Sequence, residues 1–144
     1  MKNQRPNSVT AVTQQIKPFI YPGVDDEATI ILTYPEAQAI IQASWNWPVN
    51  RKDMDIYGTE GAIHQYSGKE MAIDTNKQSE EIIVEGNTFP EEGPFSYFSA
   101  AILKDLAVGQ DDLSSLENNL IVVEILDAAR RSATEGKRIN LKSE

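Results

Sequence analysis

A change of hydrophobic period part-way along the chain is the feature that most constrains its fold. From about Ser8 to about Gly86, short β-rich runs such as EATIILTY and AQAIIQASWNW are separated by turn residues. The connections are short, so consecutive strands are expected to pair antiparallel. After FPEEGP, apolar residues recur every three or four positions, which is typical of helices. The sequence therefore predicts an α+β fold, with an open, mostly antiparallel sheet of about six or more strands and two helices packed on one face.

The two helices and a closing strand are expected near the C-terminal end. FSYFSAAILKDLAV has helical spacing, and Gly109 follows it as a stop signal. SSLE at 114–117 fits a capping box headed by Ser114. The second helix is expected to run to about Thr134, with Gly136 ending it. KRINL then predicts a short return to the sheet.

Size and charge limit the classes of function. The 144 residues suit one domain, spanning residues 1–144. The net charge is −9 and the 13 basic residues form no long run, so nucleic acid is not an expected partner. No apolar run approaches the roughly 20 residues of a membrane span, so no membrane contact is expected. The chain has no cysteine, which excludes disulfides and thiolate chemistry, and a cytoplasmic location is expected.

The second arm of the first hairpin alternates with a period of two. The side chains expected to face the core are Ala39, Ile41, Ala43, Trp45 and Trp47. The opposite row consists of Gln38, Ile40, Gln42 and Ser44. Two helices can cover only one side of the sheet, so the opposite row is expected to remain bare in a monomer. A flat surface of this kind predicts a contact between copies, and hence a homo-oligomer.

Trp45, Trp47 and Arg51 form the candidate substrate-side group. Indoles beside a guanidinium can grip a sugar or a nucleotide. The same indoles also suit a strand end that covers a helix, with each ring N–H seeking a partner at the edge. Both interpretations remain open on the residues alone.

No residue is assigned a catalytic or metal-binding role. His64 is the sole histidine, and no partner that would orient it for proton transfer can be identified, so a structural or exposed role is expected. Asp25-Asp26-Glu27 lacks the alternating carboxylates and glycine of an EF-hand and is interpreted as a solvated loop. Gly-Thr-Glu-Gly at 58–61 lacks the elements of a phosphate-binding loop and predicts a turn between strands.

Three features together resemble the C-terminal domain of the Gfo/Idh/MocA family, the glucose-fructose oxidoreductase and inositol dehydrogenase type of NAD(P)-dependent enzyme. They are the hairpin ending in Ala43-Ser44-Trp45, the strand and turn IYGTEG, and the late helix with AARRSATEGKRINL. The resemblance extends from about Ser8 to Leu141. Each motif alone is modest, but their order and spacing together are specific.

The resemblance also implies what this sequence does not contain. Family members begin with a dinucleotide-binding Rossmann domain that has a glycine fingerprint, followed by a Glu-Lys-Pro segment with a catalytic lysine. Neither pattern occurs here, so the chain is expected to be the second half of an enzyme. NAD or NADP is expected for the intact enzyme, held by the missing Rossmann domain, and no catalytic or cofactor-binding residue is assigned to this chain.

The resemblance implies a substrate-side and oligomerisation domain of a sugar- or polyol-type oxidoreductase, inactive by itself. Two alternatives stay open. The chain could be a free-standing carbohydrate-binding module that uses its tryptophans, or a purely structural dimerisation module.

Overall fold

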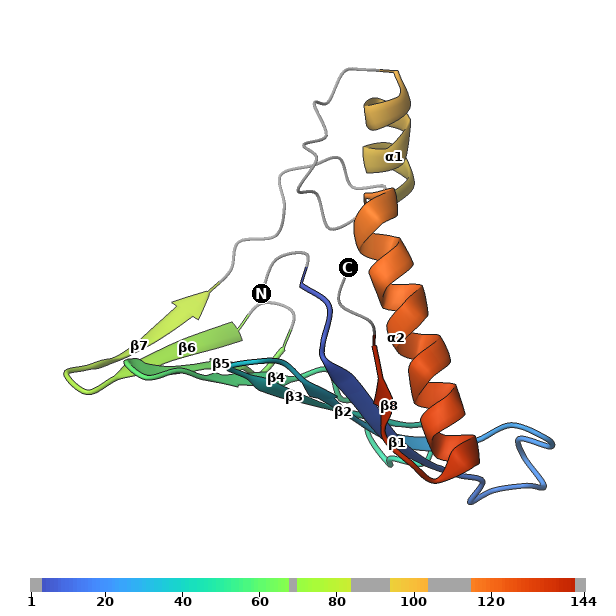
Figure 1. The fold of residues 1–144 in the computed structure, drawn as a ribbon. Helices are drawn as coiled ribbons and strands as arrows, with labels where there is room; N and C mark the ends of the chain where they lie inside the picture. Colours follow the sequence, from blue (N-terminus) through green and yellow to red (C-terminus); the bar gives the residue numbers. More distant parts are fainter. Residues whose placement is uncertain (1–3, 68–69, 84–93, 104–114, 142–144) are drawn as a thin grey trace. The chain divides into compact units, whose positions relative to one another are not determined.

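Two compact units make up the chain (Figure 1). The computed structural model describes residues 4–67, 70–83, 94–103 and 115–141. The units comprise residues 1–46 with 108–144, and residues 47–107. Each has a four-stranded sheet in which the neighbouring strands pair antiparallel. The predicted α+β class and antiparallel pairing are therefore confirmed, with the strands divided between two sheets.

The first unit is a sheet in the order β3-β2-β1-β8, with helix α2 packed on it (Figure 1). Its elements are β1 (Ser8–Gln14), β2 (Glu27–Thr33), β3 (Gln38–Ser44), α2 (Leu116–Glu135) and β8 (Ile139–Asn140). The register pairs Val9 with Leu32 and Leu32 with Ala39. These three side chains therefore share one face of the sheet.

Small residues of α2 meet that face. Ala128 and Ala129 are buried, and they pack in one cluster with Val9 and Leu32. The complete buried cluster is Val9, Ala11, Leu32, Ala128, Ala129 and Ile139. Alanine on a helix leaves room for the larger strand residues opposite it. The single helix α2 can therefore bury one face of the sheet where it lies over β1.

Ser132 fixes α2 to β1 through a buried hydroxyl. Its Oγ accepts a hydrogen bond from the backbone N–H of Ala11 at 2.9 Å. The same hydroxyl donates to the backbone carbonyl of Lys137 at 2.7 Å. Ser132 has no exposed surface, so both backbone groups rely on it for a partner. The serine of the AARRSATEG motif is thus a structural link between helix, strand and the turn that follows.

Both ends of α2 are capped as the sequence suggests, with a shift of one residue at the start. Ser115, and not Ser114, is the N-cap, and its side chain accepts from the backbone N–H of Asn118. Gly136 ends the helix with a φ of 63°, the left-handed conformation that glycine tolerates without strain. The predicted ending at Gly136 is confirmed.

The second unit contains an up-and-down sheet in the order β4-β5-β6-β7. Its elements are β4 (Met54–Tyr57), β5 (Gly61–Gln65), β6 (Glu70–Thr75), β7 (Ser79–Ile83) and α1 (Pro94–Ile102). Gly61 begins β5 where the neighbouring strand comes close, because a Cβ there would lie 2.2 Å from the carbonyl oxygen of Asp74. The predicted turn at 58–61 and the strands beside it are confirmed.

The alternation of β4, β5 and β6 gives this sheet two different faces. One face carries mainly apolar side chains, namely Met54, Ile56, Ile63, Met71 and Ile73. The other carries polar and aromatic ones, namely Asp55, Tyr57, His64, Tyr66 and Asp74. Met54 and Ile56 are 47% and 46% exposed on the apolar face.

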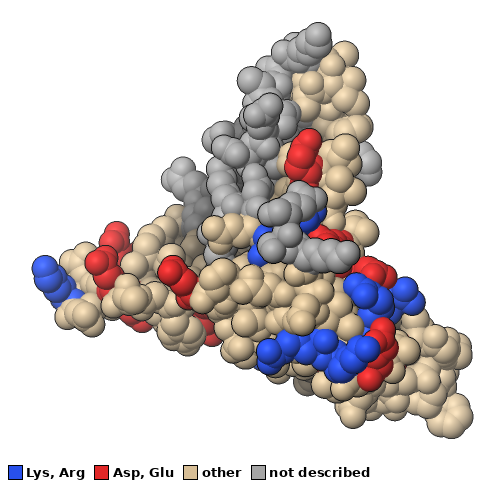
Figure 2. All heavy atoms as spheres, viewed as in Figure 1, with Lys and Arg blue, Asp and Glu red and all other residues tan. Residues whose placement is uncertain are grey.

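Charged side chains are interspersed by sign on the face that Figure 2 shows. On α2, Asp127 pairs with both Arg130 and Arg131 at 3.3 and 2.9 Å. These two donors hold the pKa of Asp127 below its ordinary value.

No helix within the described ranges is long and apolar enough to cross a membrane.

One expectation about local structure changes. The row Ala39 to Trp47 was expected to face the core throughout, but β3 ends at Ser44, and Ile41 is 45% exposed. Because α2 lies over β1 and β8, only Ala39 of that row packs against the core cluster. The helix predicted in FSYFSAAILKDLAV is confirmed as α1, whereas Gly109 lies outside the described residues.

Candidate functional site

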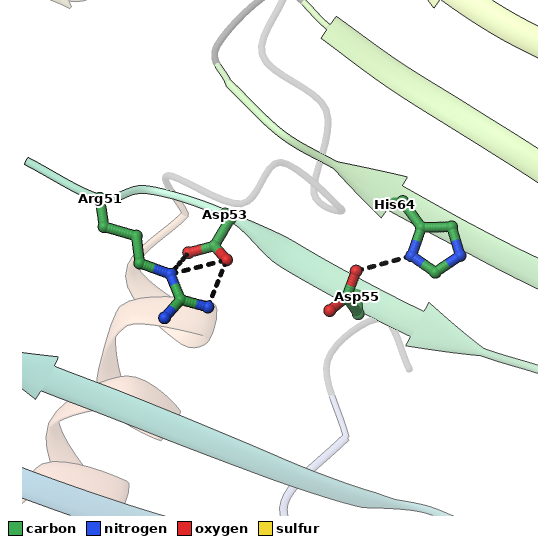
Figure 3. Close-up of polar contacts among 4 residues, drawn as sticks. All are labelled: Arg51, Asp53, Asp55 and His64. Atoms are coloured by element: carbon green, nitrogen blue, oxygen red, sulfur yellow. Dashed lines mark hydrogen bonds and ion pairs between the residues drawn. The ribbon is translucent and has the colours of Figure 1, made fainter.

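The polar face of the second unit holds His64 between two carboxylates. His64 Nδ1 lies 2.7 Å from Oδ1 of Asp55 on β4, the contact drawn in Figure 3. His64 Nε2 lies 3.4 Å from Oδ2 of Asp74 on β6. A neutral imidazole can donate from one nitrogen only, whereas an imidazolium can donate from both. In the charged form, His64 therefore joins three neighbouring strands.

Two tyrosines flank this histidine. The ring of Tyr57 meets His64 edge-on at 5.7 Å between centroids, and that of Tyr66 lies nearly parallel to it at 6.2 Å. Both tyrosines are exposed, whereas the His64 side chain is 19% exposed. The arrangement places a row of three rings across one face of the sheet, bordered by carboxylates.

The expectation that His64 has no orienting partner is wrong. Asp55 and Asp74 lie nine and ten residues away in sequence, and only strand pairing brings them to the ring. The pairing of Asp55 directly opposite His64 depends on the length of the turn between β4 and β5. Both ring nitrogens face carboxylates, and a structural role for His64 remains a prediction.

Trp47 and Arg51 come together as the sequence suggested, and Asp53 completes the group. Arg51 Nε lies 2.7 Å from Oδ1 of Asp53, and Nη2 lies 2.6 Å from Oδ2 (Figure 3). The Arg51 guanidinium carbon is 5.5 Å from the centre of the Trp47 ring, within range of a cation–π interaction. The hydrogen bonds from Arg51 hold the pKa of Asp53 below its ordinary value. These hydrogen bonds also orient the guanidinium beside the indole.

Trp45 belongs to the other unit and has a different environment. It follows the end of β3 and is 61% exposed. Its ring meets Tyr21 edge-on at 5.0 Å, and its backbone N–H donates to the carbonyl of Asp26 at 3.0 Å. The three residues of the candidate group therefore fall into two sets, Trp47 with Arg51 and Trp45 with Tyr21.

Asp26 is buried, which corrects its interpretation as part of a solvated loop. It is 3% exposed, and its two carboxylate oxygens accept the backbone N–H groups of Ile16 and Lys17, each at 2.7 Å. Burial alone would raise the pKa of Asp26, but these backbone donors and a hydrogen bond from Asn46 lower it below its ordinary value. Asp26 is therefore an internal anchor of the loop between β1 and β2.

The row predicted as an oligomer contact lies on the face of the first sheet opposite the buried cluster. Gln38, Ile40 and Gln42 are exposed, and Ile40 is 61% exposed. The register places Ile40 beside Ile31 and Thr10 on this open face. Ser44 is half-buried, and its hydroxyl donates to the carboxylate of Glu27. The use of this row as an oligomer contact remains a prediction.

The ranges that the structure describes contain no group of three or more side chains able to hold a metal ion. The candidate groups described above are instead an oriented guanidinium, exposed aromatic rings and carboxylates. Such groups can bind hydroxyl-rich molecules through stacking and hydrogen bonds.

Comparison with known proteins supports the family resemblance. Residues 1–64 match the model of the GFO/IDH/MocA C-terminal domain family. No curated protein matches. An oxidoreductase from Agrobacterium radiobacter, in complex with NAD+, L-tartaric acid and magnesium, has a similar fold with a TM-score of 0.71 and 17% identity over 94% of this chain and 43% of its own. Aldose-aldose oxidoreductase from Caulobacter crescentus, complexed with glycerol, gives a TM-score of 0.69 and 22% identity over 96% of this chain and 42% of its own. The chain thus spans less than half the length of these two structures.

Proposed function

We propose that this chain, with its GFO/IDH/MocA C-terminal domain, is the substrate-side and oligomerisation part of an NAD(P)-dependent oxidoreductase acting on a sugar or polyol. The observation that carries the proposal is the family match over residues 1–64, together with the similar fold of oxidoreductases more than twice as long. A dinucleotide needs a glycine turn at a helix N-terminus, which this sequence lacks. Binding of NAD or NADP is accordingly assigned to a separate domain, and this chain is inactive by itself. A cytoplasmic location fits a chain without cysteine.

Trp47 and Arg51 are the proposed contact to the polyol. The indole face suits the C–H surface of a sugar, and the guanidinium, oriented by Asp53, can donate to hydroxyl or carboxylate oxygens. Two similar structures hold L-tartaric acid and glycerol, both small hydroxylated molecules. This chemistry supports a substrate of the same class.

The open face of the first sheet is the proposed contact between subunits. Gln38, Ile40 and Gln42 are exposed there, and their amides can pair with those of a second copy. A two-fold contact uses the same patch on both copies. Ile40 is 61% exposed and supplies an apolar centre to this row.

NMR titration of the chain with aldoses and polyols, and separately with NAD and NADP, tests the substrate-side assignment. We expect polyols at millimolar concentration to shift the Trp47 indole N–H and the Arg51 Nε–H, and the dinucleotides to shift neither. Arg51→Ala should abolish the polyol response, whereas Trp45→Ala, in the other unit, should leave it intact. Micromolar binding of either dinucleotide, or polyol shifts that ignore Trp47 and Arg51, would contradict the proposal.

A further inference from the structure

The loop that joins β1 to β2, residues 15–25, presents apolar side chains to solvent. Phe19 is 99% exposed, and Ile16, Ile20 and Val24 are 52%, 62% and 48% exposed. A single exposed apolar residue is ordinary, but four within one short loop form a patch of the kind that marks an interaction surface. The sheet-face contact proposed above leaves this loop without a role.

Internal hydrogen bonds hold the loop in this form. The Asp26 carboxylate fixes its beginning at the N–H groups of Ile16 and Lys17. The N–H groups of Ile20 and Tyr21 both donate to the Lys17 carbonyl, at 3.0 and 2.9 Å. Gln15 Nε2 donates to the Tyr21 carbonyl at 2.6 Å, and the Tyr21 ring rests against Trp45.

This bonding fixes which side chains the loop exposes. Tyr21 faces inward to Trp45 and is half-buried, whereas Phe19 makes almost no contact within the chain. A loop already ordered in this form gives up little conformational freedom on association. Aromatic anchors of this kind often dominate the energy of an interface.

We propose that the 15–25 loop is the apolar anchor of a two-fold contact between two copies of this chain. The proposal rests on the proposed oligomerisation through the open sheet face and names what completes it. The loop continues β1 and β2 directly, so it lies at one end of that sheet.

Area is the first argument for a second copy as the occupant. The three long strands of the first sheet, seven residues each, cover roughly 14 by 23 Å, or about 330 Å² of flat surface. A stable interface needs about 800 Å² on each partner. The sheet face alone therefore falls short, but one inserted and one received phenylalanine, at about 150–250 Å² each, bring the area on each copy to roughly 630–830 Å². In a two-fold contact each copy both inserts a loop and receives one.

Charge is the second argument. The whole chain has a net charge of −9, so two copies repel each other except where a patch carries no net charge. Within residues 15–25 the only charged side chains are Lys17 and Asp25, one of each sign. The row of Gln38, Ile40 and Gln42 carries no charge at all. Apart from Glu27, which accepts a hydrogen bond from Ser44 at one end of the face, the loop and the row therefore form a surface without net charge that a second copy can approach.

Sedimentation equilibrium of the 144-residue chain and its variants tests the anchor. We expect the wild type to dimerise at micromolar concentration and Phe19→Ser to weaken the dimer about 10- to 100-fold. Phe19→Leu should restore most of the association. Val49→Ser removes a similarly exposed apolar side chain outside the surface and should leave association unchanged. Because Phe19 makes almost no contact within the chain, the melting temperature of diluted, monomeric Phe19→Ser should equal that of the monomeric wild type.

Ile40→Glu separates the loop from the face. If Ile40→Glu is monomeric while Phe19→Ser dimerises like the wild type, the loop proposal is overturned and the sheet-face contact stands. If Phe19→Ser is monomeric and Ile40→Glu still dimerises, the loop is supported and the sheet-face contact is overturned. A wild type that is monomeric at every concentration overturns both.

Discussion

The two units of this chain differ in how they hold their strands together. In the first unit, α2 covers one face of the sheet and six hydrophobic residues are buried in a single cluster. In the second unit, Ala72 is the one buried hydrophobic residue among those described. Its sheet instead shows ion pairs and hydrogen bonds between neighbouring strands, with His64 at the centre. Among the described residues, the first unit therefore shows a buried apolar cluster, and the second shows polar side-chain contacts between its strands.

This difference bears on where each unit can interact. In the first unit, α2 covers one face of the sheet, while the opposite face and the 15–25 loop are exposed and can contact a partner. The second unit leaves Met54 and Ile56 nearly half exposed on its apolar face, and its polar face carries exposed tyrosines. A small domain that buries little apolar area is marginally stable. We therefore expect the second unit to be the less stable of the two.

Truncation of a core residue gives the largest expected effect and tests the comparison most directly. Leu32→Ala removes a side chain that is 6% exposed and should cost about 2–5 kcal/mol of unfolding free energy. Ile63→Ala, on the half-buried face of β5, should cost less than half as much. Urea denaturation of both variants measures the two values. Equal losses would show that the second sheet is packed as tightly as the first.

The link between α2 and β1 gives the next effect. Ser132→Ala leaves the Ala11 N–H and the Lys137 carbonyl without their buried partner, which should cost about 1–3 kcal/mol. Thr134→Ala is the matched control, because the Thr134 hydroxyl is exposed and bonds only within its own helix, to the carbonyl of Arg130. We expect the control to stay within about 0.5 kcal/mol of the wild type. Similar midpoints of chemical denaturation for both variants would show that the Ser132 hydrogen bonds do not stabilise the packing of α2 on β1.

The sequence predicted the elements whose signals are local. The hairpin of β2 and β3, the turn at 58–61 and the end of α2 at Gly136 all follow from turn residues, alternation or caps in neighbouring positions. The start of α2 shifted by one residue because Ser114 and Ser115 offer the same cap chemistry. The correct predictions and the one-residue error at the start of α2 all concern contacts between residues close together in the sequence.

Contacts that depend on distant pairing could not be predicted. The carboxylates beside His64 reach it only through the register of three strands. Asp26 looks like any loop carboxylate until the ends of β1 and β2 bring it to two backbone N–H groups. The alternation from Ala39 to Trp47 failed because α2 lies over β1 and β8 and because β3 ends at Ser44. A short pattern indicates a strand but does not show where the strand ends.

His64 tests the polar side of the comparison. His64→Ala leaves Asp55 and Asp74 without the group between them, and we expect a loss of about 1–2 kcal/mol confined to the second unit. Native-state hydrogen exchange locates the change, since amides of β4, β5 and β6 should exchange faster while those of β1 and β2 do not. His64→Gln, which can still donate to one carboxylate, should lose less. Uniform acceleration in both units would mean that they unfold together.

The smallest effect is expected for Asp26, because it concerns one carboxylate in one loop of the first unit. The pKa of its carboxyl is lowered in the folded chain relative to the ordinary value of 3.8. A depressed pKa means that the carboxylate contributes stability at pH values above 3.8, and that this contribution is lost as the pH falls through the lower, folded value. Asp26→Asn should therefore melt below the wild type at neutral pH, and the gap should narrow as the pH falls below 3.8.

Calorimetric melting curves of the wild type and Asp26→Asn between pH 7 and pH 2 measure this gap. Asp25→Asn is the matched control, because that exposed neighbour accepts no hydrogen bond from Ile16 or Lys17, and its gap should be small at every pH. A gap for Asp26→Asn that is constant across the whole range would mean that its charge contributes nothing, and that the shape of the side chain alone holds the loop. The 15–25 loop would then keep its form in acid.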